Sequence, residues 1–65
     1  MEYIYVFAMD GAEWEDIIVY LSEEEALESS RNNPNVRLEI FQKVVKGGYH
    51  PTYNYYLGGK YIETH

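Results

Sequence analysis

The pattern of hydrophobic and polar positions opens with an apolar segment over residues 2–9. Aromatic and β-branched side chains fill this segment, and the turn residues Asp10 and Gly11 follow it, which predicts a strand. Both faces of this strand are apolar, with tyrosines on one and Ile4 and Val6 on the other. Such a strand is typical of the interior of a sheet that is covered on both sides. Because a single short helix covers one face only, we expect another chain or a folded-back loop over the second.

A second strand and then a helix are predicted next. The short apolar run over residues 17–21 indicates the strand. Ser22, with Glu25 three positions later, forms a capping box, and the glutamates of the first turn favour a helix that starts here. Pro34 and its neighbouring asparagines end the helix by about Asn32. The helical stripe that would pack on the sheet consists of Ala26, Leu27 and Ser30.

The clearest half-exposed strand lies over residues 36–45. Apolar Val36, Leu38 and Ile40 alternate there with more polar positions. The glycine pair at 47–48 ends this strand, and residues 49–51 are predicted to form a loop.

A hairpin is predicted at the end of the chain. Residues 52–57 and 60–63 each favour a strand, and the glycines at 58–59 suit a two-residue turn between them. The element order is therefore β-β-α-β-β-β. We expect a single α+β domain over residues 1–65, with a mostly antiparallel sheet of four to five strands and one helix on one face.

Length and cysteine content restrict how this domain is stabilised. The chain has 65 residues and no cysteine, which excludes disulfides, thiolate zinc sites and a cysteine nucleophile. A core of this size contributes little net stability, so small domains rely on disulfides, metals or association. We therefore expect a homo-oligomer, with a dimer favoured. The apolar runs are too short to cross a bilayer and no leader pattern is present, so we expect a soluble, intracellular protein.

Aromatic residues are unusually abundant. Eight tyrosines, one tryptophan and two phenylalanines make up 17% of the chain, more than a small core can hide with every hydroxyl paired. Tyrosine also suits strands, but rings that are half dry and half wet are typical of interfaces. The interface is predicted to use Trp14, Tyr49, Tyr53, Tyr55, Tyr56 and Tyr61.

Charge is divided unevenly along the chain. Of the net charge of −6, residues 1–30 contribute −9, with nine acids and no lysine or arginine. Residues 31–65 contribute +3, with five bases and two acids. This division indicates an acidic face toward a protein partner with a basic surface, or complementary contacts between copies. The acidic face is predicted to consist of Asp10, Glu13, Glu15 and Asp16.

No arrangement of residues indicates an enzyme, a metal site or a cofactor site. The acids of residues 10–16 lack the spacing of an EF-hand loop, and His50 has no nucleophile or orienting partner in a known motif. The two glycine pairs suit turns and do not form a phosphate-binding motif. The negative net charge argues against nucleic-acid binding.

The run FAMDGAEWEDIIVYLSEEEAL, followed by NPNVRLEIFQK and PTYNYY, resembles short uncharacterised accessory proteins of large DNA viruses. The resemblance extends over residues 3–57 and includes no catalytic or ligand motif. It implies a compact single-domain viral protein, in the host cytoplasm or the virion, that acts through contacts with itself or with a host protein.

Three functions follow from these observations. The first is a non-enzymatic interaction protein that self-associates through aromatic strand surface and presents its acidic face to a protein partner. The second is an oligomer that binds a small ligand or nucleotide in a tyrosine-lined pocket between subunits. The third is an acidic mimic of nucleic acid that blocks a basic protein groove. For the first, we expect Tyr55→Ser or Tyr61→Ser to weaken association and Val6→Asp to prevent folding.

Overall fold

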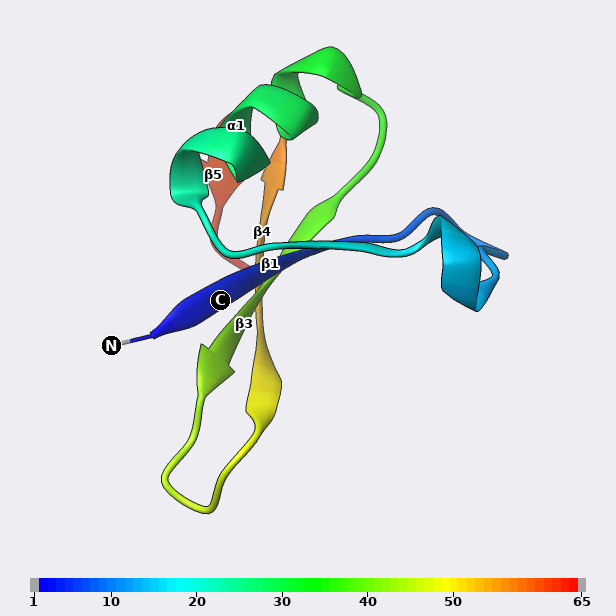
Figure 1. Ribbon diagram of the computed structural model, residues 1–65. Coiled ribbons are helices and arrows are strands. Elements are labelled where there is room, and N and C mark those ends of the chain that lie inside the picture. The colour runs from blue at the N-terminus through cyan, green and yellow to red at the C-terminus, as the bar shows by residue number, and fades with distance from the viewer. Residues whose placement is uncertain (1, 65) are drawn as a thin grey trace.

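The computed structural model describes residues 2–64 and has one antiparallel sheet and one α-helix (Figure 1). The fold is α+β, as the sequence predicts. In chain order the elements are β1 (Tyr3–Phe7), the 3-10 turn η1 (Trp14–Asp16), β2 (Ile18–Tyr20), α1 (Glu23–Asn32), β3 (Leu38–Lys43), β4 (Tyr49–Leu57) and β5 (Lys60–Ile62).

The strands lie side by side in the order β2-β1-β3-β4-β5. The strand β1 is therefore in the interior of the sheet, as its apolar faces predict. Its partner β3 follows the helix in sequence and pairs Ile40 with Tyr5. Helix α1 lies over one end of the sheet, and the hairpin of β3 and β4 extends away from it (Figure 1). We call the side of the sheet on which α1 packs the helix-bearing face, and part of this face is consequently left uncovered.

The helix begins and ends where its capping residues predict. The hydroxyl of Ser22 accepts a hydrogen bond of 3.4 Å from the backbone N–H of Glu25, and the last helical residue is Asn32. Ala26 and Ser30 are fully buried against the sheet, which confirms the predicted packing stripe. Such a short helix depends on these tertiary contacts for its stability.

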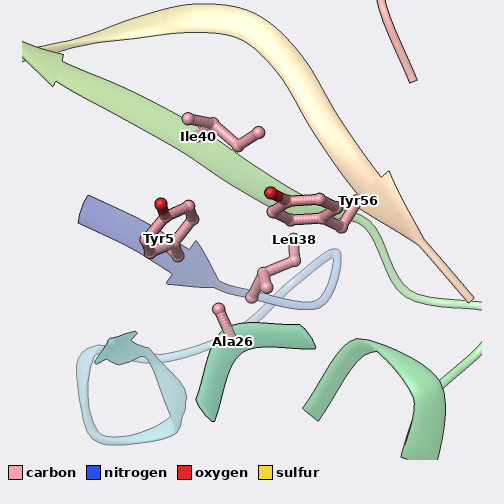
Figure 2. Packing of buried hydrophobic residues seen from close by; sticks show 5 residues of the cluster. All are labelled: Tyr5, Ala26, Leu38, Ile40 and Tyr56. Carbon is pink, nitrogen blue, oxygen red and sulfur yellow. The ribbon is translucent and has the colours of Figure 1, made fainter. Parts of the chain in front are cut away.

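The core lies on the helix-bearing face of the sheet. Its buried apolar residues are Tyr5, Ala26, Leu38, Ile40 and Tyr56. Figure 2 shows the ring of Tyr56 extending across the sheet toward Tyr5, with Ala26 of the helix beside Leu38. Partly buried Phe7, Tyr20 and Leu27 pack around this cluster. The core therefore lies between one helix and one face of the sheet.

The predicted loop at residues 49–51 is wrong, because these residues form the start of β4. A tight turn reverses the chain: the N–H of Val44 donates to the carbonyl of Gly48 at 3.1 Å. The returning strand then pairs with β3, placing Pro51 opposite Phe41. Proline is tolerated at this point because β5 pairs only with the far end of β4, so β4 has a free edge here.

The turn between β4 and β5 forms on two glycines, as predicted. Gly58 and Gly59 both have positive φ angles, of +59° and +81°, which suit a two-residue hairpin turn. The N–H of Gly59 donates a hydrogen bond of 2.9 Å to the hydroxyl of buried Ser30. The turn is thereby attached to the helix.

The second face of the sheet differs from the covered surface that the sequence predicts. Ile4 and Val6 of β1 are half-buried there, and Val19 of β2 is 51% exposed. Helix α1 packs on the opposite face and therefore does not cover these side chains. The expected cover by a second chain stays a prediction.

Candidate binding site

A bulge in β4 shapes the uncovered part of the helix-bearing face. The pairing of β3 with β4 shifts between Glu39 and Phe41, so Thr52, Tyr53 and Asn54 all lie opposite Ile40. Extra residues of this kind bend a strand and change the direction of its side chains. Tyr53, within the bulge, has a φ angle of +70°, which is unfavourable for a residue with a side chain.

Side-chain hydrogen bonds stabilise this bulge. The hydroxyl of Thr52 donates to the carbonyl of Ile40 at 2.9 Å and accepts from the N–H of Asn54 at 3.1 Å. Thr64 donates through its hydroxyl to the carbonyl of Tyr53 at 2.8 Å and through its N–H to the Asn54 side-chain oxygen at 3.3 Å. The strained conformation is therefore held from both sides.

A cleft of about 510 Å³ lies between the start of α1 and the bulged part of the sheet. We call it the tyrosine cleft, because its wall includes Tyr3, Tyr5, Tyr56 and Tyr61. Its remaining lining residues are Glu23, Ile40, Gln42, Thr52 and Asn54. Volumes of about 300–1,000 Å³ are typical of small-molecule sites, and the volume of the tyrosine cleft lies within this range.

The rings of the tyrosine cleft are inclined to one another. The centroid of Tyr56 is 6.0 Å from that of Tyr5 at an interplanar angle of 37°, and 6.0 Å from that of Tyr61 at 66°. Tyr5 and Tyr56 are buried, whereas Tyr3 and Tyr61 are 40% and 53% exposed. The rings therefore form a concave aromatic wall with a deep part and an open rim.

Glu23 provides the single carboxylate of the cleft lining. One oxygen of its carboxylate accepts a hydrogen bond of 2.8 Å from the hydroxyl of Tyr56. Burial, and then this bond, raise the pKa of Tyr56 well above its ordinary value. Burial and the nearby Glu23 charge also raise the pKa of Tyr5. Both hydroxyls are consequently neutral at physiological pH.

The opposite side of the sheet presents an apolar surface that we call the open face. It consists of Ile4, Val6, Val19, Phe41, Tyr55 and Ile62, which form three cross-strand pairs. The pairs are Ile4 with Phe41, Val6 with Val19, and Tyr55 with Ile62. Because paired residues share a face, all five strands contribute to this surface. Glu39 of β3 pairs with both Val6 and Tyr55, so its carboxylate lies on the same face and separates the pairs of β1 from the pair of β4 and β5.

Two charged residues, Arg37 and Glu39, lie on the open face itself. The guanidinium of Arg37 lies 3.8 Å from the ring centroid of Tyr55, within cation–π range. The same side chain forms an ion pair of 3.1 Å with Glu39. These two charges are therefore partnered within the chain, among the apolar residues of the face.

The six predicted interface aromatics are distributed over several surfaces. Tyr55 lies on the open face, whereas Tyr56 and Tyr61 line the tyrosine cleft on the other side of the sheet. Tyr49 donates a hydrogen bond of 3.1 Å to Glu2 at the start of β1. The two most exposed members are Tyr53 in the bulge, at 67%, and Trp14 in η1, at 87%.

Sequence reasoning missed several residues of the tyrosine cleft. Tyr3 and Tyr5 were assigned only to a strand face, and Gln42, Thr52 and Asn54 to no site. The alternation of β1 and β3 does place Tyr3 opposite Gln42, which is a usable signal. The bulge that adds Thr52 and Asn54 has no comparable signature.

The four predicted acidic residues lie together in the connection between β1 and β2. Asp10, Glu13, Glu15 and Asp16 are all exposed. The N–H of Glu13 donates to the carboxylate of Asp16 at 3.3 Å, which closes η1. The structure thus places these carboxylates on one exposed loop, and their role as a face toward a partner stays a prediction.

Within residues 2–64, no three histidine, aspartate or glutamate side chains gather in a way that could hold a metal ion. No helix among them is both long enough and apolar enough to cross a membrane. Comparisons of the chain with models of protein families, with curated proteins and with solved structures find no match, so the viral resemblance stays a prediction.

Proposed function

We propose that this protein is a non-enzymatic interaction protein that forms a homodimer through its open face. The observation that carries this proposal is the one-sided core. Five buried apolar residues lie between the helix and one face of the sheet, while the apolar residues of the other face are half-buried or, at Val19, exposed. Packing two such faces together would give each chain the second core that its size requires.

The available surface is sufficient for a stable dimer. The chain has an accessible surface of 4925 Å². A standard interface takes roughly 800 Å² from each partner, or about one sixth of this surface. The molecule extends 33 × 26 × 22 Å, so one face of the sheet and its margins can supply this area. A two-fold axis would place the same apolar patch of both copies in contact.

The open face includes one ion pair, which this dimer would bury. Arg37 contacts both the Glu39 carboxylate and the ring of Tyr55, so the two charges would be buried as a pair, which costs less than burying either charge alone. The apolar pairs on either side of Glu39 would supply most of the binding energy.

The first experiment is the solution mass by light scattering across a dilution series. We expect a dimer that dissociates on dilution. The dimer of a Phe41→Ser variant should have a dissociation constant at least about tenfold higher than that of the wild type. Trp14→Ser is the matched control, because it removes an exposed aromatic residue away from the open face. A wild-type monomer at high concentration, or equal dissociation of both variants, contradicts the proposal.

The acidic loop would remain accessible in this dimer, because its residues do not belong to the open face. We propose that Asp10, Glu13, Glu15 and Asp16 meet a partner with a basic surface. The test is binding to an immobilised polylysine peptide at low and high salt. A variant with all four acids changed to amides should lose the salt-sensitive binding, whereas unchanged binding would place the partner surface elsewhere.

A further inference from the structure

The charge of the tyrosine cleft favours one kind of ligand. Its lining includes the carboxylate of Glu23 and no lysine, arginine or histidine. Glu24 and Glu25 share the first turn of α1 with Glu23, so three negative charges outweigh the partial positive charge of the helix N-terminus, about half a unit. An anionic ligand such as a nucleotide would meet repulsion here, and a cation would meet attraction.

The aromatic wall favours the same kind of ligand. Tyrosine rings attract cations through the negative potential of their faces. The rings of Tyr5, Tyr56 and Tyr61 are inclined at 37° and 66° in successive pairs, so they approach a bound group from different directions. A wall of this shape suits a compact charged head better than a flat ring alone.

Hydrogen-bonding capacity remains for such a head group. The carboxylate of Glu23 accepts one bond from Tyr56 at one oxygen, and a carboxylate has about four acceptor positions. Tyr61 and Tyr3 at the rim are partly exposed, so the cleft is open to solvent at one side. A ligand can therefore reach both the carboxylate and the rings.

From these observations we infer that the tyrosine cleft binds a small organic cation, an amine or ammonium compound that carries an apolar or aromatic body. The ammonium head lies near Glu23 and the body lies against the tyrosines. The cleft volume of about 510 Å³ accommodates a ligand larger than the head group alone. This site lies on the opposite side of the sheet from the open face, so it does not depend on the proposed dimer.

Three probes of nearly equal size test the preference for positive charge. Benzylammonium, benzyl alcohol and benzoate share one ring and differ in the charge of the attached group. Binding is measured on the full chain by NMR chemical-shift titration at pH 7. We expect benzylammonium to bind with a dissociation constant in the millimolar range, benzyl alcohol to bind about tenfold more weakly, and benzoate not to bind.

Matched variants test the residues. Glu23→Gln keeps an acceptor for Tyr56 and removes the charge, so benzylammonium should bind about fivefold more weakly while benzyl alcohol changes by less than about twofold. Glu24→Gln is the control for charge, because Glu24 shares the helical turn but does not line the cleft. An unchanged affinity for benzyl alcohol would also show that the cleft of the variant is intact.

Three results would overturn the inference. The first is binding of benzyl alcohol or benzoate that is as tight as that of benzylammonium. The second is an equal effect of Glu23→Gln and Glu24→Gln, which would mean that the attraction comes from the overall charge of the helix and not from Glu23 in the cleft. The third is no shift with any probe at tens of millimolar, or shifts confined to residues away from the tyrosine cleft.

Discussion

The hydroxyl of Tyr56 donates a hydrogen bond of 2.8 Å to the carboxylate of Glu23, which links the C-terminal end of β4 to the first turn of α1. A second link joins the hydroxyl of Tyr20 to that of Ser29, at 3.1 Å. A third joins the N–H of Gly59 to Ser30. The short helix is therefore attached by polar contacts at its start and in its second half, in addition to its narrow apolar stripe.

The Tyr56–Glu23 contact predicts a loss of stability in alkali. The folded-state pKa of Tyr56 is raised above the unfolded value of about 10. Its contribution to the free energy of unfolding is therefore fully present below pH 10 and is lost as the pH rises through the folded-state pKa. We expect Tyr56→Phe to lower the free energy of unfolding by about 1–2 kcal/mol at pH 7 and to make its decline above pH 10 less steep.

Urea denaturation at a series of pH values measures this effect. Tyr53→Phe is the control, because Tyr53 is largely exposed in the bulge. It should leave both the stability at pH 7 and the alkaline slope close to those of the wild type. An alkaline slope of Tyr56→Phe equal to that of the wild type would show that this hydroxyl does not keep its proton in the folded state.

Gly59 is predicted to be sensitive to the addition of a single methyl group. A Cβ atom at this position would lie 2.6 Å from Cγ of Arg31, and the φ angle of +81° disfavours a side chain. Gly59→Ala should therefore lower the free energy of unfolding by about 2–4 kcal/mol, from steric overlap and backbone strain together. Thermal or chemical denaturation measures the change.

The matched control is Gly48→Ala, in the turn before β4. Gly48 has a similar φ angle of +77°, but a Cβ atom there has no neighbour within 4 Å. Only the backbone strain applies, so we expect a loss of about 1 kcal/mol. Equal losses for the two variants would mean that Arg31 moves aside without cost.

Most of the fold could be predicted from the sequence because local signals and tertiary needs coincide. Ser22 and Pro34 fix the ends of α1 by backbone chemistry, and the alternation from Val36 onward determines which side of β3 is buried. The strand at residues 49–51 could not be predicted, because Pro51 is usually a loop residue. It is accepted there only because the adjacent edge of β4 is free, which depends on the whole sheet.

The tyrosine cleft was less predictable than the fold. A tyrosine-lined pocket was one expectation, but for a pocket between subunits, whereas this cleft forms within one chain. Its position depends on two features that composition does not reveal: the length of α1 relative to the sheet, and the bulge opposite Ile40. The acidic loop, by contrast, could be predicted from the sequence, because its four carboxylates are close neighbours along the chain.

The structure changes the expectation for Val6→Asp. Val6 is half-buried on the open face, whereas Leu38 is fully buried in the core. A carboxylate at position 6 would reach solvent in a single chain, so we expect a folded variant that no longer dimerises. Leu38→Asp should prevent folding, because its charge would be buried without a partner. Circular dichroism and light scattering separate the two outcomes, and an unfolded Val6→Asp chain would show that the open face is part of the core.

The last prediction concerns Tyr55 and Tyr61, which the sequence places in one interface and the structure places on opposite sides of the sheet. Tyr55 pairs with Ile62 on the open face, and Tyr61 pairs with Tyr56 on the side of the tyrosine cleft. Tyr55→Ser should therefore raise the dissociation constant of the dimer about tenfold or more, since aromatic residues near the centre of an interface carry much of its binding energy. Tyr61→Ser should leave that constant within about twofold of the wild-type value.

Sedimentation equilibrium at matched concentrations measures both constants, and titration with benzylammonium on the same samples gives the reciprocal comparison. Tyr61→Ser should weaken benzylammonium binding and Tyr55→Ser should not, because each ring contributes to one side of the sheet only. If Tyr61→Ser dissociated the dimer as strongly as Tyr55→Ser, the two copies would be joined through the helix-bearing face. The open face would then be left for another partner, and the cleft would lie at the subunit boundary.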